Sequence, residues 1–290
     1  MTTPPRTEAV GLIGVGLLGA ALAERLIGCG FAVVGHDARE ERRAALRGLG
    51  GEAAGAVEVG RRCRRVVLCL PDSDAVESVL RDLDAELRPG QVVLDTTTGD
   101  PARMALFGAR LAEKSVTYID ACVLGSSEQA RAGDAVIMAG GQVGDNTDLL
   151  GCLSRQWFHV GGCGAGGRMK LVVNLVLGLN RAALAEGLSL AKACGLDPAA
   201  ALDVLRAGAA YSRVMDTKGE KMLRRDFRPQ ARLRQHLKDV RLILEQAARS
   251  GVRVPLSEAH RMLLERVIQL GGGDDDNCAV IRAYENGQGP

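Results

Sequence analysis

Short apolar runs alternate with stretches of helical spacing along the first 125 residues of the chain. Runs of β-branched residues bounded by glycine or polar residues are typical of buried strands, and helical stretches between them are typical of βαβ crossovers. The predicted strands are 9–13, 31–35, 65–70, 92–94, 116–119 and 136–139, and the predicted helices are 17–29, 39–49, 74–87 and 101–114. This alternation predicts an α/β fold with a doubly wound parallel sheet.

The pattern changes after the glycine-rich residues 161–164, because strand signals stop and helical spacing continues to the end of the chain. One long helix is predicted at 168–194, with Gly195 as its C-terminal cap. Further helices are predicted at 198–207, 238–250 and 256–270, followed by a loop at 271–276. We therefore expect two domains, an α/β domain at 1–163 and an all-α domain at 164–290.

Composition narrows the function classes. The 290 residues are 47% hydrophobic and 25% charged with a net charge of +2, which gives no bulk attraction to nucleic acid or to a membrane surface. The eight cysteines are scattered without a Cys-x-x-Cys pair, so we expect no metal site and thiols without disulfides in a reducing cytoplasm. The apolar stretch 171–184 contains Asn174, Asn180 and Arg181, and we expect it to fall short of a bilayer span.

A glycine-rich turn lies between the first predicted strand and helix. Residues 14–19, Gly-Val-Gly-Leu-Leu-Gly, match the G-x-G-x-x-G pattern of Rossmann domains. In that pattern Gly14 permits a tight turn, Gly16 lets the backbone approach a pyrophosphate, and Gly19 lets the helix pack on the strand. Asp37 ends the second strand, where an acid binds a ribose 2′-hydroxyl, so the two signals together predict a dinucleotide. The alternative is a tight turn in a domain that binds no nucleotide.

Asp37 also bears on the choice of cofactor. A carboxylate at this position repels a 2′-phosphate, which favours NAD over NADP. Arg39, Arg42 and Arg43 follow closely and are able to accept a phosphate instead, so NADP stays open.

Lys170 and Asn174 are the polar residues of the otherwise apolar stretch 169–177. Their spacing of four places both side chains on one face of a helix. An ammonium in apolar surroundings is costly to desolvate, so this placement indicates proton transfer beside the bound nucleotide. The alternative is a lysine that extends from a buried helix to water.

Four segments in order resemble the β-hydroxyacid dehydrogenase family, which includes 3-hydroxyisobutyrate dehydrogenases, tartronate semialdehyde reductases and glyoxylate/succinic semialdehyde reductases. They are the glycine turn, Asp-Thr-Thr-Thr-Gly-Asp-Pro at 95–101, Asp-Ala-Cys-Val-Leu-Gly-Ser at 120–126 with Ala-Arg-Ala-Gly at 130–133, and the stretch 164–174. Phe-Arg-Pro at 227–229 and Lys238-Asp239 also resemble family elements. The resemblance extends from residue 10 to about residue 284.

The resemblance implies a Rossmann domain and a helical domain joined by the long helix, with the active site in the cleft between them. It implies an NAD(P)-dependent oxidoreductase that interconverts a hydroxy acid, or a related alcohol, and its aldehyde or ketone by hydride transfer. The expected partners are a small, carboxylate-bearing substrate and further copies of the chain in a cytoplasmic homodimer or homotetramer, with neither nucleic acid nor membrane.

Residue roles follow from the same resemblance. Lys170 is the expected catalytic acid and base, and Asn174 holds the substrate or the lysine. Lys238 and the backbone amides of Leu124, Gly125 and Ser126 are expected to bind the substrate. The expected cofactor contacts are Gly14, Gly16, Leu17, Leu18, Gly19, Asp37, Leu70, Pro71 and Thr98.

The chain departs from the family in the substrate loop. Leu124 stands where the family has a serine, and Ser126 and Gln129 stand where it has glycines; Cys122 replaces a proline. The loss of a hydroxyl at position 124 removes one polar contact and adds bulk, although Ser126 or Ser127 is a candidate replacement. We therefore expect a larger or less polar substrate than 3-hydroxyisobutyrate.

Two other functions stay open. Imine reductases resemble this architecture but generally lack the lysine, and some relatives bind a dinucleotide without catalysis.

The seven basic residues between 224 and 241 fit a solvated surface with Lys238 turned inward, and the aspartates at 274–276 lack the spacing of a calcium loop.

Overall fold

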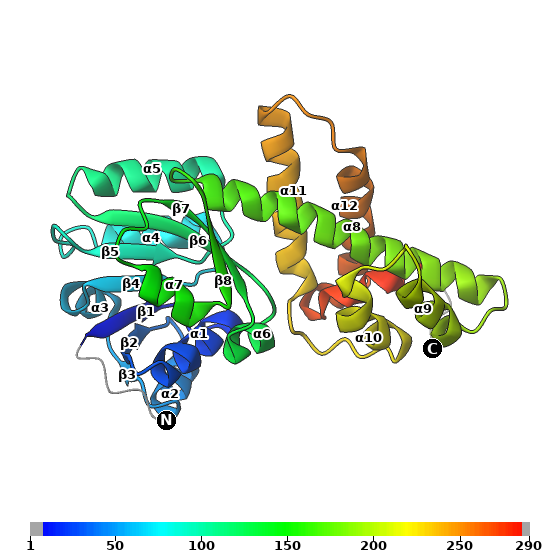
Figure 1. The fold of residues 1–290 in the computed structure, drawn as a ribbon, viewed down its shortest axis with the longest axis horizontal. Coiled ribbons are helices and arrows are strands. Elements are labelled where there is room, and N and C mark those ends of the chain that lie inside the picture. The colour runs from blue at the N-terminus through cyan, green and yellow to red at the C-terminus, as the bar shows by residue number, and fades with distance from the viewer. Residues whose placement is uncertain (1–7, 286–290) are drawn as a thin grey trace. The chain divides into compact units, whose positions relative to one another are not determined.

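The computed structural model describes residues 8–285, and an eight-stranded sheet forms the centre of its N-terminal part (Figure 1). The strands lie in the order β3 (Glu52–Ala53), β2 (Ala32–His36), β1 (Ala9–Ile13), β4 (Arg65–Leu68), β5 (Val92–Asp95), β6 (Thr117–Leu124), β7 (Val136–Gly141) and β8 (Gln156–Gly161). Neighbours from β3 to β6 pair in parallel, β7 is antiparallel to β6, and β8 is parallel to β7. The predicted α/β fold is confirmed, with β7 and β8 as a mixed extension of the parallel sheet.

Seven helices connect these strands. They are α1 (Leu17–Gly28), α2 (Glu40–Gly48), α3 (Ala56–Arg62), α4 (Ser73–Asp82), α5 (Pro101–Ala112), α6 (Ser127–Ala132) and α7 (Thr147–Leu153). Asp72 and Asp100 cap α4 and α5 by accepting bonds from backbone N–H groups, and Pro101 occupies the first turn of α5. The helices α3, α6 and α7 and the strands β3 and β8 were not predicted, because each is short or, for β8, mostly exposed at the sheet edge.

The rest of the chain is helical. It contains α8 (Ala165–Ala193), α9 (Pro198–Ala207), a π-helical turn at Met215–Gly219, α10 (Glu220–Leu223), α11 (Leu233–Arg249), α12 (Pro255–Gln269) and two 3₁₀ segments at Gly272–Asp274 and Asn277–Tyr284. Asp197 caps α9, whose bounds match the prediction. Helix α11 begins five residues before the predicted start, and the predicted loop at 271–276 contains the first 3₁₀ segment.

The chain divides into two compact units, Met1–Lys170 and Leu171–Pro290, and the division falls inside α8. The core of the N-terminal unit contains Leu12, Leu22 and Ile119, all fully buried. The core of the C-terminal unit contains Leu188 and Leu264. Each unit therefore has its own hydrophobic core, and the sequence places the domain boundary just before α8 rather than within it.

Helix α8 is, by length and composition, long and apolar enough to cross a membrane. The expectation that the stretch 171–184 is too short was wrong in this respect, because the helix that contains it has 29 residues. Such a helix is weak evidence for a membrane span, since core helices of soluble proteins pass the same test.

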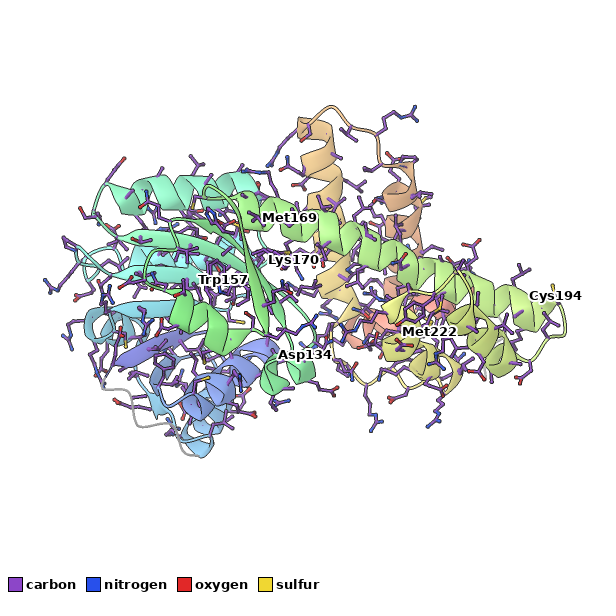
Figure 2. The ribbon with its side chains drawn as sticks, viewed as in Figure 1. Asp134, Trp157, Met169, Lys170, Cys194 and Met222 are labelled. Atoms are coloured by element: carbon purple, nitrogen blue, oxygen red, sulfur yellow. The ribbon has the colours of Figure 1, made fainter. Side chains whose placement is uncertain are left out.

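The eight cysteines all lie within residues 8–285 and form no disulfide, and Cys194, just past the end of α8, is the exposed one (Figure 2).

Candidate active site and cofactor site

The glycine turn joins β1 to α1. Gly14 has a φ of +97°, and a Cβ there would lie 2.2 Å from the carbonyl oxygen of Cys69. A Cβ at Gly19 would lie 2.0 Å from the carbonyl oxygen of Gly14, whereas one at Gly16 would meet no atom within 4 Å. Packing therefore requires glycine at positions 14 and 19, and Gly16 leaves open space before the N-terminus of α1. The first turn of α1 carries no acidic residue, so its N–H groups and dipole favour an anion such as a pyrophosphate.

Asp37 lies beside this turn. One carboxylate oxygen accepts the N–H of Val15 at 2.8 Å, and the other accepts the N–H of Arg39 at 3.0 Å. Arg42 donates to the carbonyl oxygen of Val15 at 3.1 Å, and Arg43 donates to the carbonyl oxygen of Asp37. The carboxylate is therefore fixed next to the glycine turn, while two of the three nearby arginines hold backbone oxygens.

Leu70, Pro71 and Thr98 follow the carboxyl ends of β4 and β5. Leu70 donates its N–H to the Thr97 hydroxyl at 3.1 Å, and the N–H of Cys69 donates to the carbonyl oxygen of Ile13 at 2.9 Å. These loops therefore lie at the same edge of the sheet as the glycine turn, which is where ligands bind in parallel α/β sheets.

Two buried carboxylates lie on the same face of neighbouring strands, because Asp95 of β5 is in register with Asp120 of β6. Asp95 accepts the Tyr118 hydroxyl at 2.6 Å and the Thr97 N–H at 2.9 Å. Burial nevertheless raises the pKa of Asp95 to about 6, and the charge of Asp120 adds to this effect. Burial also raises the pKa of Asp120 above its ordinary value.

Asp120 holds the N-terminus of α8. Its two carboxylate oxygens accept the N–H of Gly164 at 3.0 Å and that of Gly167 at 2.8 Å. A Cβ at Gly140 would lie 2.4 Å from a carboxylate oxygen of Asp120, and one at Gly166 would lie 2.2 Å from its carbonyl oxygen. Glycines on β7 and α8 thus allow the helix to begin directly against β6, which sets the position of the next turn.

Lys170 lies in that next turn (Figure 2). Lys170 is 8% exposed, and its Nζ donates to the carbonyl oxygen of Val123 on β6 at 2.7 Å. The predicted burial of this amine is confirmed, and the side chain does not extend into bulk water.

Asn174 and Lys238 belong to the C-terminal unit, where one carboxylate holds both. The Asn174 amide donates to Asp239 at 2.9 Å, and the Lys238 Nζ lies 3.0 Å from the other oxygen of Asp239. Asp239 has no role among the residues expected from the sequence, although it is adjacent to Lys238. Its hydrogen bond with Asn174 is visible only in the structure, because α8 and α11 bring residues 65 positions apart into contact.

The loop after β6 differs from the expectation. Leu124, half-buried, pairs with Val136, and Gly125 has a φ of +151° before the chain enters α6. The N–H of Ser126, expected to donate to a substrate, donates instead to the Gln129 side chain at 2.9 Å. The Ser126 hydroxyl accepts the N–H of Gln129 at 3.2 Å, which completes a capping box.

The charged segments that the sequence singled out form ion pairs. Lys218 pairs with Asp276 at 2.8 Å and Arg282 with Asp275 at 2.8 Å, while Arg234 pairs with Asp274. Within residues 8–285, no group of three or more His, Cys, Asp or Glu side chains is placed to hold a metal ion.

Two family models match consecutive parts of the chain. Residues 9–161 match the NAD binding domain of 6-phosphogluconate dehydrogenase, and residues 164–284 match the model for NAD-binding of NADP-dependent 3-hydroxyisobutyrate dehydrogenase. The first match contains the glycine turn, and the second begins one residue before α8.

Several dehydrogenases are similar to this chain over almost its whole length. The chain is 29% identical over 283 residues to the L-threonate dehydrogenase of Cupriavidus necator, with 95% of each covered. It is 30% identical over 284 residues to the 2-(hydroxymethyl)glutarate dehydrogenase of Eubacterium barkeri, with 95% of this chain and 94% of that protein covered. The crystal structure of 3-hydroxyisobutyrate dehydrogenase from Salmonella typhimurium has a TM-score of 0.87 at 26% identity, with 95% of this chain and 99% of that chain covered. The chain therefore belongs to the β-hydroxyacid dehydrogenase family of NAD(P)-dependent oxidoreductases.

Proposed function

We propose that the chain interconverts a hydroxy acid, or a related alcohol, and its aldehyde or ketone, with Lys170 as the proton donor and acceptor. The observation that carries this proposal is the buried Lys170 amine, 2.7 Å from the carbonyl oxygen that precedes the β6 loop. The two bonds from Asp120 to the start of α8 support it, because they fix the helix that carries the amine.

The chain supplies acid–base chemistry and orientation. In the reduction, Lys170 gives a proton to the developing alkoxide; in the oxidation, the neutral amine takes the hydroxyl proton. A nicotinamide, when bound, supplies or accepts the hydride. Asn174, held by Asp239, orients the substrate, and Lys238 attracts its carboxylate.

The residues at the carboxyl edge of the sheet fit a dinucleotide. Gly14, Gly16 and Gly19, with the backbone of Leu17 and Leu18, would hold the pyrophosphate, because the space over Gly16 is open. Leu70, Pro71 and Thr98 would lie at the nicotinamide half. We favour NAD over NADP, since the Asp37 carboxylate is fixed beside the turn while Arg42 and Arg43 hold backbone oxygens.

A cytoplasmic homodimer or homotetramer is part of the proposal. Thiols without disulfides suit a reducing compartment. Helix α8 exposes Val172, Val176 and Leu190 of the C-terminal unit, and an apolar face of this kind suits association of identical chains. Light scattering on wild type and Val176→Glu tests this: the proposal expects the variant to have a lower mass, and a monomeric wild type would contradict it.

The experiment for catalysis is oxidation of NADH and NADPH with small aldehydes, keto acids and cyclic imines. We expect turnover of carbonyls that falls by about 10²-fold or more in Lys170→Ala, the usual contribution of a general acid. Lys192→Ala is the matched control, since Lys192 is an exposed lysine of the same helix.

Each alternative has its own result in this screen. Turnover of imines alone would favour an imine reductase, and cofactor binding without turnover of any compound would favour a non-catalytic binding protein. Full activity in Lys170→Ala would overturn the role of the lysine.

A further inference from the structure

Arg181 is a buried cation in the C-terminal unit. It lies on α8 and is 4% exposed, and its Nε and Nη1 atoms have no hydrogen-bond partner among residues 8–285. Burial lowers the pKa of Arg181 to about 10, which leaves the guanidinium charged at neutral pH. A buried charge is costly unless an opposite charge or hydrogen bonds compensate it. Two N–H groups of this cation are therefore able to bind a further group.

The carboxylate whose charge acts on Arg181 is already bonded to other groups. This carboxylate is Asp276, and its two oxygens accept the Lys218 Nζ at 2.8 and 3.0 Å. They also accept the backbone N–H groups of Gln230 at 2.9 Å and of Cys278 at 3.1 Å. Because Lys218 compensates the charge of Asp276, the ion pair leaves Arg181 with one uncompensated positive charge.

Two imidazole rings lie against the same face of α8. A Cβ at Gly178 would lie 2.6 Å from the Nε2 of His236 on α11 and 2.7 Å from the Cε1 of His260 on α12 (Figure 1). Arg181 is three residues further along α8, which places it on the face that the rings contact. His260 is 3% exposed, and its Nε2 has no partner in the described part of the chain. Burial and the charge of Arg181 lower the pKa of His260 to about 4, so the ring is neutral at neutral pH.

We propose that Arg181 and His260 bind a small monovalent anion, of the size of chloride, inside the C-terminal unit. The guanidinium supplies one positive charge and two N–H donors, and neutral His260 adds a donor in the tautomer that carries hydrogen on Nε2. Burial of both residues favours a small inorganic ion over a phosphate ester or a side chain from another molecule. The bound anion joins α8 to α12, two turns beyond Asn174 on α8.

The first test measures the stability of the wild-type chain at neutral pH in sodium chloride and in sodium gluconate of the same ionic strength. Gluconate has the same charge as chloride but is a much larger anion. A ligand that binds only the folded chain stabilises it, so chloride at about ten times Kd should raise the unfolding midpoint by about 3 °C or more. Thermal unfolding followed by helical circular dichroism measures this shift, and equal midpoints in the two salts would overturn the proposal.

The variant Arg181→Met locates the site, since methionine fills similar space without a charge or a donor. The difference between the chloride and gluconate midpoints should disappear in this variant. It should persist in Arg224→Met, the matched control at an exposed arginine of the same unit. A difference that persists in Arg181→Met would be a general salt effect, and the proposal would then be wrong.

The second test needs no variant, so it also decides the question if Arg181→Met does not fold. Crystals of the wild-type chain grown in sodium bromide should show an anomalous peak within hydrogen-bond distance of the Arg181 guanidinium and the His260 Nε2. Density without an anomalous signal would be water, and a carboxylate in its place would be a contact with another chain; both results, like a lack of density, contradict the proposal. A bromide peak without any effect of chloride on the midpoint would be an adventitious ion only and would also contradict it.

Discussion

Buried polar side chains in this protein differ in how their hydrogen-bonding atoms are paired. Lys170 has a carbonyl partner and Asp120 has two amide partners, so both keep a defined position. His260 and Arg181 lie in the core of the C-terminal unit, and the Nε2 of His260 has no hydrogen-bond partner among the residues that the structure describes. Burial, with the charge of Arg181, lowers the pKa of His260 to about 4.

This lowered pKa predicts a loss of stability in acid. The unfolded chain takes up a proton near pH 6.5, the ordinary value, but the folded His260 does so only near pH 4. The free energy of unfolding should therefore fall between pH 6.5 and 4, by up to about 3 kcal/mol from this group. Denaturant unfolding of wild type and His260→Gln at several pH values measures the difference. His159→Gln, at an exposed histidine of β8, is the control, and identical slopes for His260→Gln and wild type would contradict the assignment.

Asp37 carries a prediction about the cofactor. Removal of its charge in Asp37→Ala should raise the ratio of NADPH to NADH efficiency by about tenfold, because the repulsion of a 2′-phosphate disappears. Steady-state kinetics with both cofactors measures the ratio. Glu41→Ala removes an exposed carboxylate of α2 nearby and should leave it unchanged. An unaltered preference in Asp37→Ala would count against its proposed role.

At the scale of elements, the start of α8 lies in close contact with β6 and β7 of the sheet. Gly140, Gly166 and the Asp120 carboxylate meet there, and no side chain fits between them. Because Lys170 is one turn further along, the position of the amine depends on this contact.

We expect Gly166→Ala to destabilise the protein by about 2 kcal/mol and to lower kcat, since its Cβ would overlap the Asp120 carbonyl oxygen at 2.2 Å. Gly187→Ala, in the same helix, is the matched control, because a Cβ there meets no atom within 4 Å. That change should be neutral or stabilise by up to about 1 kcal/mol. Thermal unfolding and kinetics of both variants provide the comparison, and equal effects would contradict the tight contact.

The sequence predicts elements well where local signals are strong. Helix α9 has Asp197 as its cap and Pro198 in its first turn, and β1 is a continuous apolar run, so the bounds of both match the prediction. The edge strand β8 and the short helices lack such signals because their positions depend on contacts with the sheet.

The features of the candidate site also divide into those that a local sequence pattern predicts and those that depend on the fold. The glycine turn and the lysine helix have local patterns, and so does the capping box of Gln129, whose pattern is Ser-x-x-Gln. The contact of Asp239 with Asn174 needs two helices to meet, so no local pattern predicts it. The catalytic and binding roles stay predictions.

At the scale of the molecule, the two units have separate cores, so unfolding of the N-terminal unit can be followed separately from unfolding of the whole chain. Trp157, the single tryptophan, lies in β8 and packs against the core of the N-terminal unit. Its fluorescence therefore reports on that unit, whereas helical circular dichroism reports on both units.

Saturation with NAD should stabilise the unit that Trp157 reports on. At a concentration of about 100 times Kd, the ligand adds about 2.7 kcal/mol, which corresponds to an increase of about 5 to 10 °C in the midpoint. Thermal unfolding followed by tryptophan fluorescence, with and without NAD, measures this shift. Inorganic phosphate at the same concentration is the ionic control, and a midpoint that NAD leaves unchanged would contradict cofactor binding at the glycine turn.

The distribution of thiols gives the chain a natural attachment point for a dye. Burial raises the pKa of Cys63 to about 11 and that of Cys278 to about 12, so neither is a thiolate at neutral pH. Cys194 is exposed just beyond α8. A maleimide fluorophore should therefore couple there first, which allows site-specific labelling of the helical unit in the native sequence.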